Sequence, residues 1–245
     1  MARLRSNKVS SQLSNPPHYD TTGVVTPGRY RFLAMDDTGE RYVHAWPDRL
    51  LARVPEGAKV LDVGCSRGAF GEALKAYSPG RAVYGIEPTG AAEHAATVLD
   101  GVVRGSFPAD LPAEWTGFDV VTFFDVLEHL VDPWEALRRA RDLLAPGGRV
   151  MATIPNIRCV AVSVPLLLRG EWRYTDVGLL DRTHLRFFTR SGIEELFAEG
   201  GYATEAVVPW LREDINTRVA RVLKRFGHRF DDLTSLQFLV TARPR

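Results

Sequence analysis

The residues best suited to chemistry lie in one short segment, KVLDVGCSRGAFG, at positions 59–71. An apolar run contains Asp62, and Gly64 and Gly68 follow it. This pattern predicts a buried parallel strand that turns sharply into a helix. Glycines let the backbone approach a ligand closely, and the N-terminus of the next helix offers free N–H groups and positive potential. We therefore expect a ligand-binding crevice that carries the negative charge of Asp62.

The acid in this turn separates two classes of nucleotide cofactor. A dinucleotide pyrophosphate favours a G-x-G-x-x-G turn without a carboxylate that points into it, and here Ser66 replaces the middle glycine. A zwitterionic, cationic ligand such as the methionyl sulfonium part of S-adenosylmethionine suits an acidic, glycine-opened turn better. The segment therefore favours S-adenosylmethionine over a dinucleotide.

A second acid agrees with this interpretation. The segment AVYGIEP at 82–88 predicts a short strand that ends in Glu87, where a carboxylate can accept hydrogen bonds from both ribose hydroxyls. A third buried strand, FDVVTFFD, covers 118–125. A helix from Pro133 to about Leu144, a proline-glycine-glycine turn and another strand follow it.

The motifs VLDVGCSRGAF, VYGIEP, FDVVTFFDVLEHL and LLAPGGRVMATIPN occur in this order within residues 57–208. Together they resemble the class I S-adenosylmethionine-dependent methyltransferases. The resemblance implies a doubly wound, Rossmann-like α/β fold, in which helices cover both faces of a seven-stranded, mostly parallel sheet whose last strand is antiparallel. It also implies a site for S-adenosyl-L-methionine. The residues expected at that site are Asp62, Gly64, Cys65, Gly68, Glu87, Pro88, Ser106, Phe107 and Asp125.

Two positions depart from the family pattern. Ser66 stands where the family usually has glycine, and Ser106 stands where an acid that contacts the adenine amino group is common. We expect Ser106 or the backbone of Phe107 to substitute for that acid, with the Phe107 ring packed on the adenine.

A narrower resemblance lies in GEWRYTDVGLLDRTHLRFFT at 170–189. This segment is similar to one in bacterial methyltransferases of glycan and polysaccharide gene neighbourhoods, which are assigned to the O-methylation of sugars. Aromatic side chains would offer flat faces to sugar C–H groups, and arginines would bind hydroxyls, a phosphate or a uronate. The aromatic residues are Trp172, Tyr174, Phe187 and Phe188, and the arginines are Arg169, Arg173, Arg182 and Arg186.

The expected activity is therefore O-methylation of a sugar or glycan precursor in polysaccharide or glycoconjugate biosynthesis. The alternative enzyme is a small-molecule O-methyltransferase that acts on a quinone, a phenol or another natural product, because the motifs at 60–154 would look much the same. A hydroxyl acceptor needs a base in either case, since it is a poor nucleophile until its proton is being removed.

Two histidines compete for the role of base, because imidazole is best matched to that task near neutral pH. We assign it to His184, in the segment that the fold would place over the transferable methyl group, and expect Asp181 to orient its ring. The alternative is that Asp181, Arg182 and His184 form a structural cluster. His129 follows the strand at 118–125 and is the other candidate base.

A metal-dependent mechanism also stays open. Asp125, Glu128, His129 and His184 resemble the ligand set with which small-RNA 2′-O-methyltransferases hold a divalent ion. Mg²⁺ or Mn²⁺ at such a site would bind the acceptor oxygen and lower its pKa. Asp125 replaces a longer glutamate, and these acids could instead orient the cofactor and cap the adjacent helix. We favour the mechanism without metal.

Composition indicates a cytoplasmic enzyme. With 245 residues, of which 45% are hydrophobic and 25% charged, the chain can fill the core of one α/β domain. A net charge of +1 gives no global reason to expect nucleic acid or a membrane as partner. No stretch reads as a signal peptide or a membrane span, and the two cysteines suggest no disulfide framework. We expect a small-molecule or glycan acceptor, and leave a homodimer open.

The chain divides into a flexible tail at 1–28 and a single methyltransferase domain at 29–245. Within the domain we expect a cap at 29–56, a substrate lid at 155–190 and a basic helical insertion at 211–230. Apolar residues of this insertion recur at helical spacing. They predict packing on the chain's own domain or, as a third kind of function, docking of a glycosyltransferase or second subunit. These residues are Val219, Val222, Leu223 and Phe226.

Overall fold

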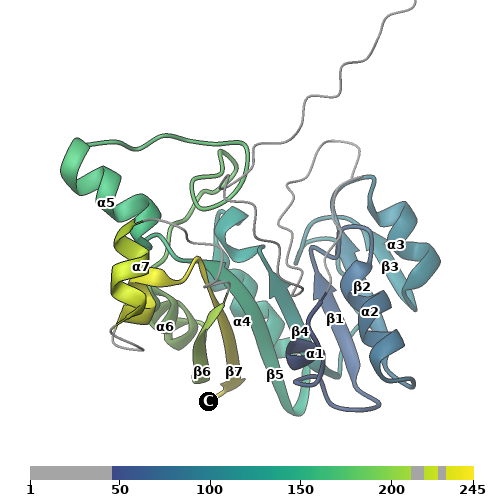
Figure 1. Ribbon diagram of the computed structural model, residues 1–245. Helices are drawn as coiled ribbons and strands as arrows, with labels where there is room; N and C mark the ends of the chain where they lie inside the picture. Colours follow the sequence, from purple (N-terminus) through teal and green to yellow (C-terminus); the bar gives the residue numbers. More distant parts are fainter. Residues whose placement is uncertain (1–45, 211–217, 226–229) are drawn as a thin grey trace, which may run out of the picture.

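The computed structural model describes residues 46–210, 218–225 and 230–245. The expected tail at 1–28, most of the cap at 29–56 and parts of the insertion at 211–230 lie outside the described residues. Seven strands form one sheet in the order β3-β2-β1-β4-β5-β7-β6 (Figure 1). The strands are β1 (Lys59–Val63), β2 (Ala82–Glu87), β3 (Gly101–Arg104), β4 (Phe118–Phe124), β5 (Leu144–Pro155), β6 (Tyr202–Trp210) and β7 (Gln237–Pro244).

The direction of the strands confirms the expected fold class. Strands β3, β2, β1, β4 and β5 pair in parallel, whereas β7 is antiparallel to both of its neighbours, β5 and β6. The last strand in the sequence is thus inserted between β5 and the edge strand β6. This is the doubly wound, Rossmann-like sheet that the motifs predict.

Helices cover both faces of the sheet (Figure 1). They are α1 (Asp48–Leu51), α2 (Ala69–Tyr77), α3 (Ala92–Val98), the 3-10 helix η1 (Leu127–His129), α4 (Pro133–Leu143), α5 (Val160–Arg169), α6 (Arg190–Glu199), α7 (Arg218–Lys224) and α8 (Asp231–Thr234). Two hydrophobic clusters correspond to the two faces. One contains side chains of α4 and α6, and the other contains side chains of α1, α2 and α3.

The sequence of β1 explains this two-sided burial. Val60 belongs to the cluster with α1, α2 and α3, while Leu61 and Val63 belong to the cluster with α4 and α6. A central parallel strand is covered on both sides, so its apolar residues are continuous. The acid within it, Asp62, is only 3% exposed. A charged side chain at such a position needs a polar partner or a function.

The expected helix after β4 is also present, and its N-terminus has the expected signals. Asp132 caps α4 by accepting a hydrogen bond from the Glu135 N–H at 2.8 Å, and Pro133 occupies the first turn. The proline-glycine-glycine turn at 146–148 lies within the bounds of β5, where the pairing of β4 and β5 shifts register between Phe118 and Val120.

The segment at 155–190 leaves the sheet after β5, as the substrate lid was expected to do. It begins with α5, which the sequence analysis did not foresee, and then returns irregularly toward α6 (Figure 1). The backbone N–H groups of Leu185 and Arg186 both donate to the Glu128 carbonyl, at 2.8 and 3.0 Å. These bonds fasten the returning segment to η1, directly after β4.

Candidate functional site

The carboxyl ends of β1, β2 and β4 lie side by side, which is where doubly wound folds bind ligands. Asp62 pairs in register with Gly85 of β2 and Thr122 of β4. The Thr122 hydroxyl donates to Asp62 Oδ1 at 2.7 Å. Burial nevertheless raises the pKa of Asp62 to about 7. Sequence reasoning found the acid but missed Thr122, which lies on another strand.

The turn after β1 has no room for larger residues. Gly64 has a φ of 71°, and a Cβ there would lie 2.6 Å from Val126 Cγ2. Gly68 has a φ of 85°, and a Cβ there would lie 2.7 Å from Val98 Cγ2. Both positions therefore require glycine for conformation and for space. The turn passes close to the segment after β4 and to α3.

Ser66, the departure from the family pattern, also has a left-handed backbone, with φ of 47°. This conformation explains why glycine would be favoured there. The Ser66 N–H donates to Glu87 Oε2 at 2.9 Å. Its buried Oγ has no hydrogen-bond partner among the described residues. A hydroxyl in this state offers a group that a bound cofactor can satisfy.

Glu87 lies at the end of β2, where the sequence places it, and is 3% exposed. Its Oε1 accepts a hydrogen bond from the Thr89 N–H at 3.0 Å, and its Oε2 accepts the one from Ser66. A carboxylate has about four acceptor positions, so two remain for ribose hydroxyls. The structure thus links the second acid to the glycine turn and leaves it able to bind ligand.

The other expected cofactor residues differ in their exposure. Cys65 is 4% exposed and packs in the hydrophobic cluster with α2, and burial raises the pKa of its thiol. Pro88 and Ser106 are exposed, and the Ser106 N–H donates to Asp110 Oδ2 at 2.8 Å. The half-buried Phe107 ring lies edge to face with Phe123 at 5.7 Å. Cys65 can therefore contribute through its backbone rather than its thiol.

Asp125 begins the turn after β4 with a left-handed backbone, φ of 56°. Its Oδ1 accepts hydrogen bonds from the Thr153 hydroxyl at 3.1 Å and from Gln237 Nε2 at 2.5 Å. Burial raises its pKa to about 7, and the two hydrogen bonds oppose that shift. Gln237 lies on the last strand, so no local signal in the sequence connects it with this site.

The two candidate bases, His129 and His184, meet at this edge of the sheet. Their rings lie edge to face with centroids 4.8 Å apart. His129 Nδ1 is 3.2 Å from the Thr183 carbonyl oxygen, and His184 Nδ1 is 3.3 Å from the Leu179 carbonyl oxygen. A proton on Nδ1 satisfies both carbonyls, and Nε2 of each ring is then an acceptor.

Asp181 does not hold His184 as the sequence analysis expected. Its Oδ1 accepts hydrogen bonds from the N–H and the hydroxyl of Thr183, at 2.8 and 2.6 Å. Among the described residues, the ring of His184 is instead held by the Leu179 carbonyl. A backbone carbonyl can orient an imidazole, and the amino-acid sequence does not reveal such a contact. Asp181 remains close enough to His184 to oppose the lowering of its pKa.

The environment keeps both histidines neutral near pH 7. Burial is the largest cause that lowers the pKa of His129. Burial also lowers the pKa of His184, and the neighbouring His129 lowers it further. A neutral imidazole can accept a proton or bind a metal ion, whereas imidazolium can do neither.

Glu128, the second acid of the expected ligand set, completes this group. The side chain is 1% exposed, and neither carboxylate oxygen has a hydrogen-bond partner among the described residues. Burial and the nearby Asp125 hold its pKa well above the usual range. One ligand atom each from Glu128, His129 and His184 lie within 4.8 Å of one another. Asp125, the fourth expected ligand, is engaged by Thr153 and Gln237 instead.

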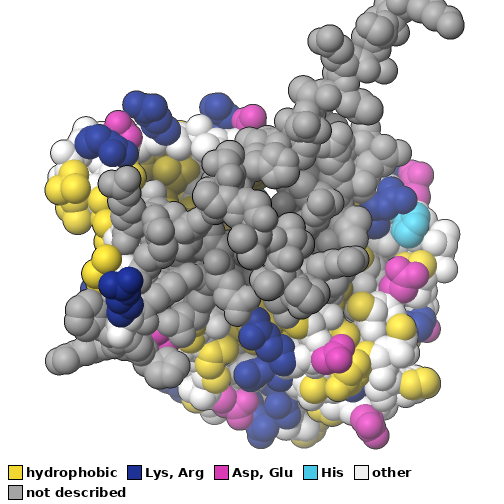
Figure 2. All heavy atoms as spheres, viewed as in Figure 1, with side chains coloured by type: hydrophobic (Ala, Val, Ile, Leu, Met, Phe, Trp, Pro, Cys, Tyr) yellow, Lys and Arg dark blue, Asp and Glu magenta, His cyan; other side chains and the backbone are white. Residues whose placement is uncertain are grey.

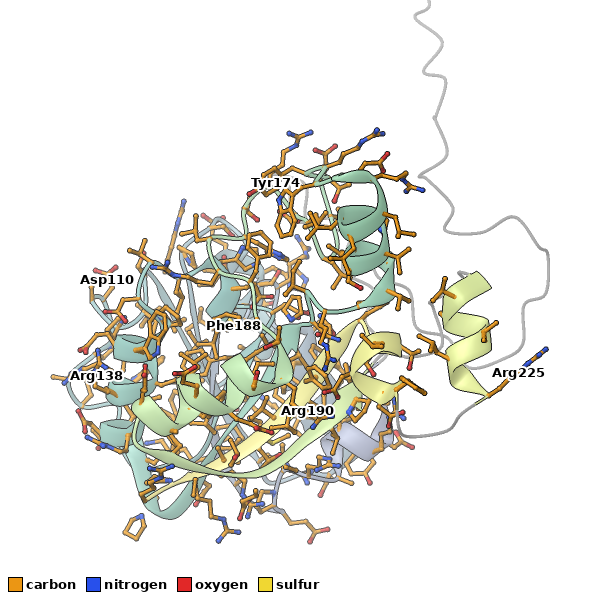
Figure 3. All side chains as sticks on the ribbon, turned by 90° about the vertical axis from the view of Figure 1, so that its left-hand side faces the viewer. Asp110, Arg138, Tyr174, Phe188, Arg190 and Arg225 are labelled. Carbon is orange, nitrogen blue, oxygen red and sulfur yellow. The ribbon has the colours of Figure 1, made fainter. Side chains whose placement is uncertain are left out.

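One aromatic ring of the lid lies beside His184, and two further rings pack around that ring. Trp172 lies 5.1 Å from Phe187 and 6.4 Å from Tyr174, and Phe187 lies 6.2 Å from His184, all between ring centroids. Phe188 packs in the main core. In Figure 3, Tyr174 lies in the outer part of the lid near α5, and Phe188 lies nearer the sheet. The expected set of four aromatic residues thus divides into one ring next to His184, two that pack around it and one in the core.

The arginines of the lid have partners of their own. Arg169 and Arg173 both contact Glu171, at 3.1 and 3.4 Å, and Arg182 contacts Asp176 at 2.9 Å. Arg186 donates to the Val131 carbonyl at 2.5 Å. Ion pairs with acids of the same segment reduce the support for a phosphate or uronate site here.

Comparison with known proteins identifies the family of this chain. Residues 35–207 match a family model described as a methyltransferase domain. A ubiquinone biosynthesis O-methyltransferase from Caulobacter vibrioides is 42% identical over 113 residues, which are 43% of this chain and 44% of that protein. An uncharacterized 37.1 kDa protein from Streptomyces fradiae is 31% identical over 192 residues, 72% of this chain and 52% of that protein. The chain thus spans about half the length of these curated relatives.

Solved structures share the fold at low sequence identity. A Haloferax volcanii methyltransferase complex with the Trm112 activator gives a TM-score of 0.59 at 19% identity, over 80% of this chain and 88% of that chain. The O-methyltransferase NcsB1 from neocarzinostatin biosynthesis, in complex with S-adenosylmethionine and a naphthoic acid, gives 0.52 at 17% identity, over 80% and 52%. At these identities the likeness establishes the fold alone.

Proposed function

Because this chain belongs to the methyltransferase domain family and has the S-adenosylmethionine-dependent methyltransferase fold, we propose that it methylates a hydroxyl group of a small aromatic molecule. A phenol or a reduced quinone is the class of acceptor that fits best. The observation that carries this proposal is the position of Phe187 beside His184, with Trp172 and Tyr174 packed around Phe187. Flat aromatic faces next to a candidate base suit an acceptor whose hydroxyl is attached to a ring.

The sugar acceptor that the lid segment suggests has less support. The relatives at 42% and 31% identity include ubiquinone biosynthesis O-methyltransferases, and NcsB1 was solved with a naphthoic acid. The lid arginines that would bind a charged glycan are paired with Glu171 and Asp176. The small-molecule alternative is therefore our first choice. Cytoplasmic location remains a prediction from composition, and the question of a homodimer stays open.

The residues at the strand ends suit S-adenosylmethionine, which supplies an electrophilic methyl group on a sulfonium sulfur when bound. Glu87 has free acceptor positions for the ribose hydroxyls, and the unpartnered Ser66 Oγ lies in the same turn. An ionised Asp62 favours the positive charges of the methionyl part. Gly64 and Gly68 have no side chain, so the cofactor can approach the backbone of the turn closely.

The chemistry then requires little more than position and a proton acceptor. In our proposal His184 Nε2 takes the proton of the acceptor hydroxyl, and S-adenosylmethionine, held by Glu87 and Asp62, would supply the methyl group to the hydroxyl oxygen. The Leu179 carbonyl fixes the tautomer of His184 that makes Nε2 the acceptor. His129, at 4.8 Å between ring centroids, can relay the proton onward.

The same residues also fit a divalent metal ion. Glu128 has two buried oxygens without partners, and His129 and His184 each have a nitrogen available. This mixed oxygen and imidazole set suits Mn²⁺ or Mg²⁺. When bound, the ion would lower the pKa of the acceptor hydroxyl. If methyl transfer depends on a metal ion, His184 acts as a metal ligand; if it does not, His184 acts as the base.

The test begins with calorimetric titration of S-adenosylmethionine into wild type, Glu87→Ala and the exposed control Glu72→Ala. We expect binding that is lost in Glu87→Ala and kept in the control. A methyl-transfer screen over catechols, reduced quinones and free sugars, with and without chelator, then identifies the acceptor class. Turnover of sugars alone would overturn the aromatic acceptor, and absence of cofactor binding would overturn the enzyme itself.

A further inference from the structure

One edge of the molecule exposes apolar side chains that the proposed reaction does not use. We call it the α5–α7 edge, and define it by Leu166, Leu167, Leu168, Val219 and Val222. Leu167 and Leu168 are 81% and 78% exposed. Figure 2 shows hydrophobic side chains along the left edge, where α5 and α7 lie in Figure 1, with Lys and Arg side chains beside them.

The shape of this edge is a projecting tip rather than a groove. Helix α5 extends away from the sheet and ends at Gly170, which has a left-handed backbone (Figure 1). Its first turn is anchored, because Val160 packs with Cys159 and Ala220 in a small cluster against α7. The three leucines are consecutive, so they point in different directions around the last turn of the helix. Packing against other described residues does not account for these leucines, because Leu167 and Leu168 are largely exposed.

The charge beside the tip is positive although the whole chain is almost neutral. Arg169 and Arg173 follow the leucines and share one acid, Glu171. In Figure 3 Arg225 extends from the end of α7 away from the body of the molecule. A neighbouring anionic surface would be attracted to this side of the protein.

We propose that the α5–α7 edge docks on the surface of an anionic lipid bilayer. Projecting leucines suit insertion at the boundary between headgroups and acyl chains, and the exposed Arg225, which extends from the end of α7, suits the headgroup phosphates. A protein partner would instead favour a broad, flat patch with complementary shape. The association is peripheral, since no helix in the described ranges is long and apolar enough to cross a membrane. Docking would bring the part of the lid that follows α5 close to the bilayer.

Vesicle flotation of the full chain tests the proposal. The probes are vesicles of phosphatidylcholine alone and vesicles of equal parts phosphatidylcholine and phosphatidylglycerol. We expect binding to the anionic vesicles, with an affinity that falls about tenfold in Leu167→Ser/Leu168→Ser and falls at high salt. The control Tyr77→Ser removes a large exposed side chain from α2, and we expect it to bind like wild type.

Two further measurements make the outcome unambiguous. Circular dichroism and methyl transfer to a soluble acceptor, or cofactor binding if no acceptor is found, show that Leu167→Ser/Leu168→Ser is folded. Light scattering after size exclusion shows whether the same leucines join two copies of the chain. The proposal is overturned if wild type does not float with anionic vesicles, or if the double variant floats equally well. A wild-type dimer that the double substitution dissociates, without vesicle binding, would assign the edge to self-association instead.

Discussion

His129 and His184 meet edge to face with ring centroids 4.8 Å apart, although one belongs to η1 after β4 and the other to the lid after α5. Each ring is held through Nδ1 by a backbone carbonyl, that of Thr183 or Leu179. The two rings meet where the segment after α5 lies on η1, and there Leu185 and Arg186 donate to the Glu128 carbonyl. The position of the proposed base thus depends on the packing of this segment against η1.

Replacement of the proposed base should affect turnover and leave cofactor binding intact. We expect His184→Gln to lower kcat by about 10²- to 10⁴-fold, the usual contribution of a general base. The affinity for S-adenosylmethionine should stay within about twofold of wild type, because the cofactor residues lie on β1 and β2. Steady-state kinetics and calorimetry measure the two effects. A His184→Gln enzyme with wild-type kcat would eliminate His184 as the base.

The comparison with His129→Gln separates base from metal ligand. If His184 acts alone, His129→Gln should lose much less activity than His184→Gln. If both histidines and Glu128 hold a metal ion, the losses should be similar and added Mn²⁺ should restore part of each. Chelator would then inactivate the wild type as well.

The raised pKa of Asp62 predicts how stability changes with pH. Folding raises this pKa from 3.8 to about 7, so the unfolded chain releases the proton more readily. The contribution of Asp62 to stability is complete below about pH 4 and is lost as the pH rises through 7. We expect the free energy of unfolding, measured with urea, to decrease from pH 5 to pH 8. The decrease should be smaller in Asp62→Asn than in wild type. Asp125 and Glu128 act in the same direction, so part of the decrease should persist.

The affinity for the cofactor should rise with pH, whereas the stability of the free protein falls. An ionised Asp62 attracts the cationic groups of the ligand, so the affinity for S-adenosylmethionine should increase from pH 6 to pH 8. Calorimetry across this range measures it, with Asp62→Asn as reference. Equal pH dependence in the two proteins would exclude Asp62 as the group responsible.

Glu128 is expected to reduce the stability of the free protein while it serves the site. Its carboxylate is buried without a partner, so Glu128→Met should increase the free energy of unfolding at pH 8 by about 1–3 kcal/mol. Activity should fall, as is common for polar groups kept at functional sites. Urea denaturation gives the first quantity, and the exposed Glu195→Gln is the control. Destabilisation by Glu128→Met would show that the carboxylate makes a stabilising contact.

Two glycines allow the cost of a left-handed backbone to be separated from the cost of a steric clash. Gly57 and Gly64 have nearly equal φ values, 67° and 71°, but a Cβ at Gly57 meets nothing within 4 Å. Gly57→Ala should destabilise the protein by about 1–2 kcal/mol, the cost of the left-handed backbone. Gly64→Ala should add about 1–3 kcal/mol because of the contact with Val126, and should weaken cofactor binding. Equal losses of stability in the two variants would mean that the turn can move away from Val126.

Local patterns in the sequence were sufficient for the elements that we propose to hold the cofactor. The apolar run before Gly64, the acid at the end of β2 and the proline at the start of α4 each depend on a few neighbouring residues. Parallel strands then bring their carboxyl ends to one edge, so Asp62 and Glu87 come together without further information. The order and direction of the strands agree with the motifs for the same reason.

The tertiary structure alone decided how the second half of the site is held. Gln237 reaches Asp125 from the last strand, and the Leu179 carbonyl holds His184 where Asp181 was expected. Such contacts join residues that are distant in sequence, or use backbone atoms that residue types do not reveal. The burial of Glu128 and the exposure of Leu167 likewise depend on which segments pack together. Residue type and spacing specify a local element, whereas packing determines which side chains share a dry interior and which face the solvent.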